Sequence, residues 1–384
     1  MTNDTDLLII GAGPFGLSMA AYAAHWRLDH FTVGKPMEFW QSHMPKGMYL
    51  RSACDWHLDP VGIDTIESFL KAQNLASAQV EPLSLEFYLR YVAWFRQRKG
   101  IAPLPLRVRK LDYSPQAERF HALTEDDDVI AARNVVLAIG FKYFKRLPGE
   151  LARCVPAGRL AHTCDLVDFA PLAGKRCLIV GGRQSAFEWA ALIREAGAAA
   201  VHVCHRHDSP SFAVPDWSWV GPLVDKTADD PAWFRKLPAA RQEELNRRLW
   251  GEGRLKVEPW LEPRIGAGGA VKLWPRTQLL SCSEQSDGAL AATLDNGETL
   301  IVDQIIAATG YQVDIARVPF LAAGNVLERL TTKNKFPKLD EHFQTNIPGL
   351  FITSMPAVQD FGPFWGFTIA APVSAQIIGR AVRS

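Results

Sequence analysis

The chain has 384 residues, with 42 Lys and Arg against 41 Asp and Glu, and 48% of its residues are hydrophobic. This length suits two ordinary domains, and the balanced charge gives no bulk attraction to nucleic acid or to an anionic membrane. The longest apolar stretch, residues 7–24, is interrupted by Gly and Pro, which argues against a membrane span. An acidic start, and six cysteines without C-x-x-C or C-x-x-x-x-C spacing, predict a cytoplasmic protein with free thiols.

One phosphate-binding pattern occurs twice along the chain. Residues 7–16 read as an apolar strand followed by Gly-Ala-Gly-Pro-Phe-Gly, and residues 177–186 repeat a strand followed by Gly-Gly-Arg-Gln-Ser-Ala. The first glycine of such a motif permits the tight turn of the backbone, the second lets a pyrophosphate approach the backbone, and the third lets the helix pack on the strand. Each copy is followed by a hairpin signal and a strand ending in Ala-x-Gly. Positions 11 and 181, and positions 135 and 305, are both 170 residues apart, so the repeat predicts two dinucleotide sites.

The other elements follow from apolar spacing and turn residues. In chain order, we expect a helix from residue 14 to about 26, a strand at 31–33, an irregular stretch at 34–62, a helix at 85–98, a short strand at 106–108 and a strand at 135–140. The aromatic residues of the helix at 85–98 are expected to pack in the core. Further helices are expected at 239–250 and 371–383.

Together these elements predict an α/β fold with two Rossmann-like, three-layer dinucleotide-binding domains, the second inserted in the first. The first domain is expected to comprise residues 1–165 and 303–384, and the second residues 166–302. An insertion is expected at about residues 208–263, and six of the 12 Trp lie between residues 217 and 274. These Trp either line an apolar substrate cavity or a partner surface, or form the core of a small helical subdomain.

The ordered motifs resemble those of the two-dinucleotide flavin monooxygenases, or class B, with flavin-containing, N-hydroxylating and Baeyer–Villiger members. Residues 11–16 are similar to the family's FAD turn, and residues 181–186 with Glu188 to its NADPH turn. Residues 158–163 match the centre of its F-x-G-x-x-x-H-x-x-x-Y/W fingerprint, although Pro156 and Leu166 replace the flanking aromatics. Residues 303–311 match the D-x-x-x-[LF]-A-T-G-Y segment of N-hydroxylating members, with Ala307 as a departure, and residues 38–50 resemble their flavin-contacting loop.

The resemblance implies two groups of site residues. For FAD they are Gly11, Gly13, Pro14, Phe15, Gly16, Lys35, Trp40, Met48, Leu50, Val108, Ala138 and Gly140. For NADPH or NADH they are Gly181, Arg183, Gln184, Ser185, Arg206, Thr309 and Gly310. No catalytic side chain is identified, because the cofactors carry the chemistry. No metal site is expected, since one Cys and two His at the strand end 204–207 are poor tetrahedral ligands.

Three positions depart from the usual nucleotide pattern. Gly34 and Lys35 stand where an acidic residue normally binds the FAD ribose; Lys35 could meet a phosphate or a hydroxyl instead, and Glu38 stands one turn later. Arg183 replaces the second glycine of the later turn, where it either blocks the pyrophosphate or grips it, and we favour gripping. Arg206 stands where a carboxylate would select NAD, so it either favours the 2′-phosphate of NADP or is a surface residue.

The activity implied by the resemblance is that of an FAD-dependent monooxygenase using NAD(P)H and O2. Its reduced flavin would form a C4a-(hydro)peroxide that passes one oxygen atom to a small organic substrate, with N- or S-oxygenation favoured. The alternatives are an NAD(P)H-dependent flavin oxidoreductase or oxidase without substrate oxygenation, a disulfide reductase, which would need a Cys pair, and a non-catalytic dinucleotide sensor. We expect no nucleic-acid partner, and a homo-oligomer is compatible with the sequence. His162 and residues 309–310 are expected at a hinge between the domains.

Overall fold

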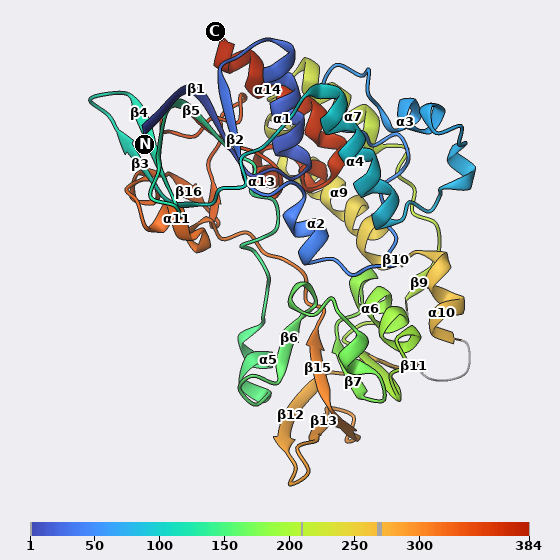
Figure 1. Cartoon of the computed structure of the whole chain (residues 1–384). Helices are drawn as coiled ribbons and strands as arrows, with labels where there is room; N and C mark the ends of the chain where they lie inside the picture. The colour runs from blue at the N-terminus through green and yellow to red at the C-terminus, as the bar shows by residue number, and fades with distance from the viewer. Residues whose placement is uncertain (1, 209, 267–270, 384) are drawn as a thin grey trace.

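The computed structural model describes residues 2–208, 210–266 and 271–383. Figure 1 shows a larger upper part, which holds both chain ends, and a smaller lower part built from central residues. Each part contains its own sheet. Within the described ranges, no helix is long and apolar enough to cross a membrane.

The first sheet has the strand order β2-β1-β5-β4-β3, with β18 also pairing with β5. Strand β5 changes partners along its length: its first half pairs with the antiparallel hairpin β3–β4 and its last three residues pair with the parallel strand β18. Its other edge lies parallel to β1, which is parallel to β2 in turn. The bounds are β1 (Thr2–Ile10), β2 (His30–Val33), β3 (Val108–Ser114), β4 (Arg119–Thr124), β5 (Val129–Leu137) and β18 (Leu350–Ile352).

Helices α1 (Pro14–His25), α4 (Leu85–Lys99) and α14 (Ala371–Arg383) pack beside the first sheet, close to the predicted positions. Helix α4 begins at Ser84, whose hydroxyl accepts the N–H of Phe87 at 3.1 Å. Its aromatic residues Tyr88, Tyr91 and Phe95 are completely buried. The expectation that these rings pack in the core is therefore confirmed.

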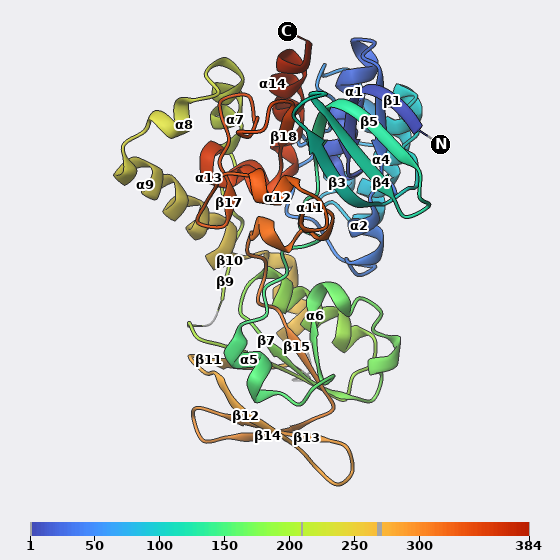
Figure 2. The same ribbon diagram turned by 90° about the vertical axis from the view of Figure 1, so that its left-hand side faces the viewer.

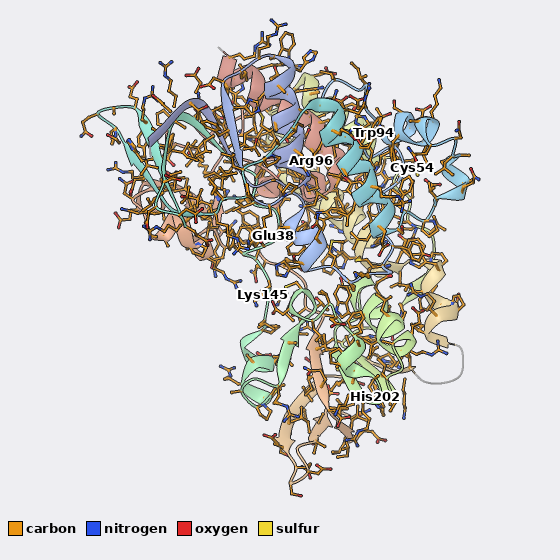
Figure 3. All side chains as sticks on the ribbon, in the orientation of Figure 1. Glu38, Cys54, Trp94, Arg96, Lys145 and His202 are labelled. Atoms are coloured by element: carbon orange, nitrogen blue, oxygen red, sulfur yellow. The ribbon has the colours of Figure 1, made fainter. Side chains whose placement is uncertain are left out.

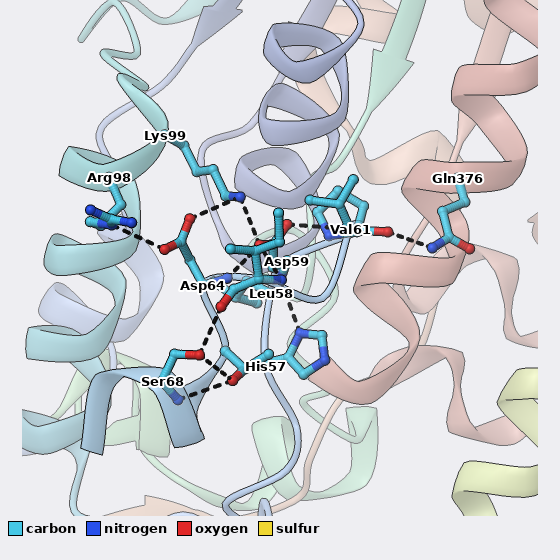
Figure 4. A network of polar contacts seen from close by, with 12 residues as sticks. His57, Leu58, Asp59, Val61, Asp64, Ser68, Arg98, Lys99 and Gln376 are labelled. Atoms are coloured by element: carbon cyan, nitrogen blue, oxygen red, sulfur yellow. Dashed lines mark hydrogen bonds and ion pairs between the residues drawn. The ribbon is translucent and has the colours of Figure 1, made fainter. Parts of the chain in front are cut away.

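A buried polar network holds the loop that precedes α3 (Ile66–Ala72). The carboxylate of Asp59 accepts backbone N–H groups of Val61, Ile63 and Asp64 at 2.7–3.1 Å. Lys99 of α4 places its Nζ 2.7 Å from Asp59 and 2.9 Å from Asp64 (Figure 4). The stretch predicted as irregular is thus fixed by charge, and it also contains one short helix, α2 (Glu38–Ser42).

The second sheet is parallel throughout, with the order β11-β8-β7-β15-β6. Its two faces alternate along each strand: Ile179 faces α6 (Gln184–Glu195), and Leu178 faces the antiparallel sheet β12–β13–β14. The strand after each glycine turn motif has the same neighbour in both sheets, since β7 lies parallel to β15 as β1 lies parallel to β5. The predicted α/β class with two nucleotide-binding folds is confirmed. The bounds are β6 (Leu160–His162), β7 (Arg176–Val180), β8 (Ala200–His205), β11 (Val271–Pro275), β12 (Leu279–Glu284), β13 (Leu290–Leu294), β14 (Thr299–Val302) and β15 (Gln304–Ala307).

The predicted points at which the chain crosses between the domains are wrong for two strands. Both β6 and β15 belong to the second sheet, although boundaries at residues 165 and 303 assigned them to the first domain. The reason is that β15 pairs with both β7 and β6, so the chain leaves this sheet only after residue 307. A smaller correction concerns the strand expected at 106–108, because β3 begins at Val108.

The Trp-rich insertion packs against the end of the chain. Figure 2 shows its helices α7 (Val220–Asp229), α8 (Trp233–Lys236) and α9 (Ala239–Trp250) beside α13 (Val358–Phe361) and α14. Its buried Trp219, Trp233 and Phe234 join the core of the first sheet, whereas its last residues, including Val257 and Leu261, pack in the core of the second sheet. The helix predicted at 239–250 is confirmed. A π-helical turn (Gly251–Leu255), β10 (Lys256–Val257), which pairs with β9 (Ser211–Phe212), and α10 (Glu262–Gly266) lead back to the second sheet.

Candidate functional site

A cavity of about 450 Å³ opens beyond the carboxyl ends of β1, β2 and β5. This is the edge at which open parallel sheets bind their ligands. The predicted FAD residues that line it are Gly11, Gly13, Pro14, Phe15, Lys35, Trp40, Val108, Ala138 and Gly140. Nine residues from four separate segments of the sequence are therefore brought together around one space.

The β1–α1 turn leaves room for an anion at one position. Gly11 has φ +112°, and a Cβ there would lie 2.4 Å from the carbonyl oxygen of Ala138. A Cβ at Gly16 would lie 1.7 Å from the carbonyl oxygen of Gly11, whereas a Cβ at Gly13 would meet no atom within 4 Å. Because Gly13 is the N-cap of α1 and lines the cavity, its open side faces the positive end of that helix. The turn thus fits a pyrophosphate.

Glu38 of α2 contributes a neutralised carboxylate to the cavity wall. Its Oε2 lies 2.9 Å from Nζ of Lys142, and its Oε1 accepts a hydrogen bond from Arg107. Burial raises the pKa of Glu38, but the two cations outweigh burial and the pKa is lowered overall. Figure 3 shows Glu38 where the upper and lower parts meet. A carboxylate therefore lines the cavity one turn after the end of β2, and its partners Arg107 and Lys142 gave no signal in the sequence.

Aromatic side chains form the part of the wall that leads toward the second sheet. Trp40 stacks on Tyr88, with ring centroids 4.9 Å apart. Phe39 and Phe141 line the cavity, and Phe141 lies 5.1 Å from the ring of Tyr311. The C-terminal loop adds Gly366 and Thr368 to the lining. Phe141, Gly366 and Thr368 were not identified from the sequence, because their segments meet the others only in the folded chain.

Three of the predicted FAD residues do not line the cavity. Gly16 lies beneath the turn, where it allows α1 to pack on the strand. Met48 and Leu50 instead pair through their backbones with Leu85 at 3.0 Å and Leu83 at 2.7 Å. The predicted flavin-contacting loop, residues 38–50, therefore lines the cavity with residues 38–40 and lies beside α4 with residues 48–50.

The second turn repeats the geometry of the first. The N–H of Gly181 donates to the carbonyl of Cys204 at 3.0 Å, and a Cβ at Gly181 would lie 2.4 Å from the carbonyl oxygen of Ala308. The Arg183 side chain reaches from this turn to the insertion: its Nη1 donates to the carbonyl of Arg254 at 3.1 Å, and its guanidinium lies 4.9 Å from the ring centre of Trp250. Gln184 and Ser185 open helix α6.

Arg206 follows the last residue of β8 and is exposed. The side chains on either side of it, His205 and His207, have ring centroids 4.6 Å apart and tilted by 32°. Both pack against the turn, since a Cβ at Gly182 would lie 2.5 Å from each side chain. Burial, with His207 and Arg183 nearby, lowers the pKa of His205. Arg206 therefore stands beside the second turn without being part of its packing.

Thr309 and Gly310 lie where the chain crosses between the sheets. The N–H of Arg146 donates to the carbonyl of Gly310 at 2.9 Å, and His162 has its Nε2 3.1 Å from the same oxygen. The hydroxyl of Thr309 donates to the carbonyl of Arg146. Lys145, labelled in Figure 3, lies in the same crossing segment. His162 and residues 309–310 are thus brought together, as expected, and not on the cavity wall.

Asp303, the first residue of the matched D-x-x-x-x-A-T-G-Y segment, links two strands of the second sheet through Arg176. Its carboxylate accepts the backbone N–H of Arg176 at 2.7 Å and two guanidinium bonds from the same residue at 2.8 and 3.1 Å. The hydrogen bonds from Arg176 hold the pKa of Asp303 at about 2. The pair joins the starts of β7 and β15. Among the described residues, no cluster of three or more His, Cys, Asp or Glu is arranged to hold a metal ion.

Comparison with known proteins places this geometry among flavoproteins. The sequence profile of the pyridine nucleotide-disulphide oxidoreductases matches residues 8–231. An FAD-dependent urate hydroxylase from Xanthomonas campestris pv. campestris is 28% identical over 339 residues, covering 83% of this chain and 68% of that protein. Two solved structures share the fold: an FAD-bound cadaverine monooxygenase from Erwinia amylovora (TM-score 0.76, 18% identity, 99% of this chain and 94% of that one), and an ornithine hydroxylase from Pseudomonas aeruginosa (TM-score 0.78, 15% identity, 99% and 98%).

Proposed function

The chain belongs to the pyridine nucleotide-disulphide oxidoreductase family, and from this membership we propose that it is an FAD-dependent, NAD(P)H-using monooxygenase. The observation that carries the proposal is the cavity at the first turn, where the open side of Gly13 faces the positive end of α1. The likeness to the urate hydroxylase, together with six cysteines that lack C-x-x-C or C-x-x-x-x-C spacing, supports oxygenation rather than disulfide reduction.

FAD would be held at the cavity by backbone and by a few side chains. Gly11, Gly13 and Phe15 surround the space that suits the pyrophosphate, while Lys35 and Glu38 border the end of β2. Trp40, fixed by its stack on Tyr88, would limit the flavin end of the space. When bound, FAD supplies the hydride acceptor and the group that activates O2. The chain itself supplies orientation and shelter.

NADPH would bind at the second turn, from Gly181 to Ser185. Arg206 would meet its 2′-phosphate, because an exposed guanidinium at the end of the second strand suits that group. We propose that this nucleotide site belongs to a domain of about residues 160–307, which includes β6 and β15, with the crossing segment at Thr309 and Gly310 acting as its hinge. Movement there would bring nicotinamide to flavin and afterwards exclude water.

We propose that the substrate is a small nitrogen compound, oxygenated at nitrogen. Urate, cadaverine and ornithine, named for the three similar proteins, are all small and nitrogen-rich. O2 is the co-substrate. A cytoplasmic location fits the six cysteines, all of which are free thiols. A homo-oligomeric assembly is compatible with the proposal.

The test is substrate-coupled oxygen use. FAD-loaded protein is given NADPH and a panel of small amines, amino acids, purines and thioethers, while O2 consumption, hydrogen peroxide and oxygenated product are measured. The proposal predicts that one nitrogen compound lowers the peroxide released per NADPH consumed and yields an equal amount of product. Stoichiometric peroxide with every compound would instead support an oxidase without substrate oxygenation.

A further inference from the structure

The insertion borders the mouth of the second nucleotide turn. Its residues Gly251–Leu255 and the strand after them run beside the first turn of α6. Arg183 donates to the carbonyl of Arg254 at 3.1 Å, and the N–H of Glu258 donates to Oε1 of Gln184 at 3.1 Å. The insertion and the predicted coenzyme turn are therefore in direct contact.

Arg51, from the loop beyond α2, holds this segment of the insertion in place. Its Nη1 donates to the carbonyl of Gly253 at 2.6 Å, its Nη2 donates to that of Lys256 at 3.3 Å, and its Nε lies 2.8 Å from Glu258. These bonds fix the backbone on both sides of Arg254. The side chain of Arg254 takes no part in them and is left exposed.

The acids of this region are already committed to other cations. Glu258 pairs with Arg51, and Glu252 pairs with Lys256 at 2.6 Å. Over the described part of the chain, no carboxylate forms an ion pair with Arg183 or Arg254. Arg183, the N-cap of the 12-residue helix α6, is thus a cation without a counter-charge at the positive end of a helix, and Arg254, whose carbonyl it contacts, is a second one. This is the electrostatic arrangement of an anion site.

An independent observation at the same turn is an unpartnered histidine nitrogen. His205 is only 3% exposed, and its Nε2 has no hydrogen-bond partner among the residues that the structure describes. Its ring packs against Gly182 of the turn. Buried polar atoms are nearly always hydrogen-bonded, so a missing partner beside this turn points to a ligand group.

We propose that Arg183 and Arg254 together bind the pyrophosphate of the nicotinamide dinucleotide, so that the insertion supplies half of the coenzyme's anion site. The inference rests on the proposed function, and it assigns Arg183 to gripping the pyrophosphate rather than blocking it. Because Arg51 ties the same segment to the loop beyond α2, bound coenzyme would link the insertion, that loop and the second turn.

The experiment measures coenzyme binding to the FAD-loaded protein by titration calorimetry, with NADP⁺ and with ADP-ribose. Arg183→Ala and Arg254→Ala should each weaken both ligands roughly tenfold or more, the usual effect of losing one charge-assisted bond. Arg254→Lys should recover part of the loss. Both Ala variants should show a weaker salt dependence of binding than the wild type. Adenosine 2′-monophosphate, which has no pyrophosphate, should bind all forms alike.

Arg247→Ala is the matched control, because Arg247 lies on the neighbouring helix α9, is strongly exposed and, among the residues that the structure describes, forms its ion pair with Glu243. It should bind both ligands like the wild type. Wild-type affinity in Arg254→Ala would overturn the inference and leave the proposed function standing, and tighter binding by Arg183→Ala would show that Arg183 blocks. A wild type that holds FAD but binds neither ligand would overturn both the inference and the coenzyme part of the proposed function.

Discussion

Replacing Gly13 by Val should remove FAD binding while leaving the fold intact. A Cβ at Gly13 would meet no protein atom within 4 Å, and the backbone there is extended, with φ −82° and ψ −170°, which Val adopts without strain. The added carbons enter only the cavity. The free energy of unfolding of the apoprotein should therefore change by no more than about 1 kcal/mol.

The effect on FAD follows from hydrogen-bond lengths. Phosphate oxygens must come within about 2.9 Å of the backbone N–H groups of the turn, whereas carbon atoms need about 3.5–4.0 Å from any neighbour. Val at this position holds the pyrophosphate off, and each charge-assisted bond lost costs about 1.5–3 kcal/mol. The loss of two bonds raises the Kd for FAD at least a hundredfold, or about 2.8 kcal/mol. Fluorescence titration of apoprotein with FAD, beside thermal unfolding, measures both effects.

Two other glycines serve as controls for this prediction. Gly149, at the start of α5 (Gly149–Cys154), is equally open but lies outside the cavity, so Gly149→Val should bind FAD normally. Gly16→Ala should fail to fold, because its Cβ would lie 1.7 Å from a backbone oxygen. Wild-type FAD affinity in Gly13→Val would refute the assignment of the pyrophosphate to this turn.

Three further predictions concern the coenzyme, the hinge and stability. Arg206→Ala should raise the KM for NADPH roughly ten- to a hundredfold and leave that for NADH unchanged, whereas equal effects in steady-state assays would make Arg206 structural. Gly310→Val, at φ +73°, should keep FAD bound but slow flavin reduction or release more hydrogen peroxide per NADPH; stopped-flow rates and coupling equal to the wild type would contradict this. Lys99→Met should destabilise the fold by about 3–5 kcal/mol in urea unfolding, because it leaves Asp59 buried without its cation. Burial raises the pKa of Asp59, but Lys99 and the backbone N–H groups outweigh burial and lower it in the folded state. The ion pair therefore stabilises the fold above about pH 4, and this stabilisation is lost as the pH falls further. If the stability of Lys99→Met fell with acid just as that of the wild type does, this prediction would be refuted.

The repeated turns could be predicted from the sequence because their chemistry is local. Gly11 and Gly181 have positive φ, and both lie against a carbonyl from the returning strand, as two Ala-x-Gly segments in the same register implied. The helix at 239–250 likewise follows from its own spacing. Short-range patterns of this kind also fixed the α/β class.

The missed parts of the site depend on contacts between distant segments. Glu38 is neutralised by cations 69 and 104 positions away, and Arg51 reaches carbonyls about 200 positions away. No periodicity records such pairs. The insertion was misread for the same reason, because the residues that bury Trp233 come from the end of the chain. Strand β15 was placed in the wrong sheet because the Ala-x-Gly motif identifies the strand and not the partners on both of its edges.

The most direct test of the account is anaerobic reduction of the purified protein's flavin. The visible absorbance of the FAD-loaded protein is followed while NADPH or NADH is added without oxygen, and air is then admitted. The account predicts that the protein holds or takes up FAD, that NADPH bleaches the flavin, and that air restores the oxidised spectrum. A protein that neither contains nor takes up FAD, or whose bound flavin no nicotinamide coenzyme reduces, would contradict it.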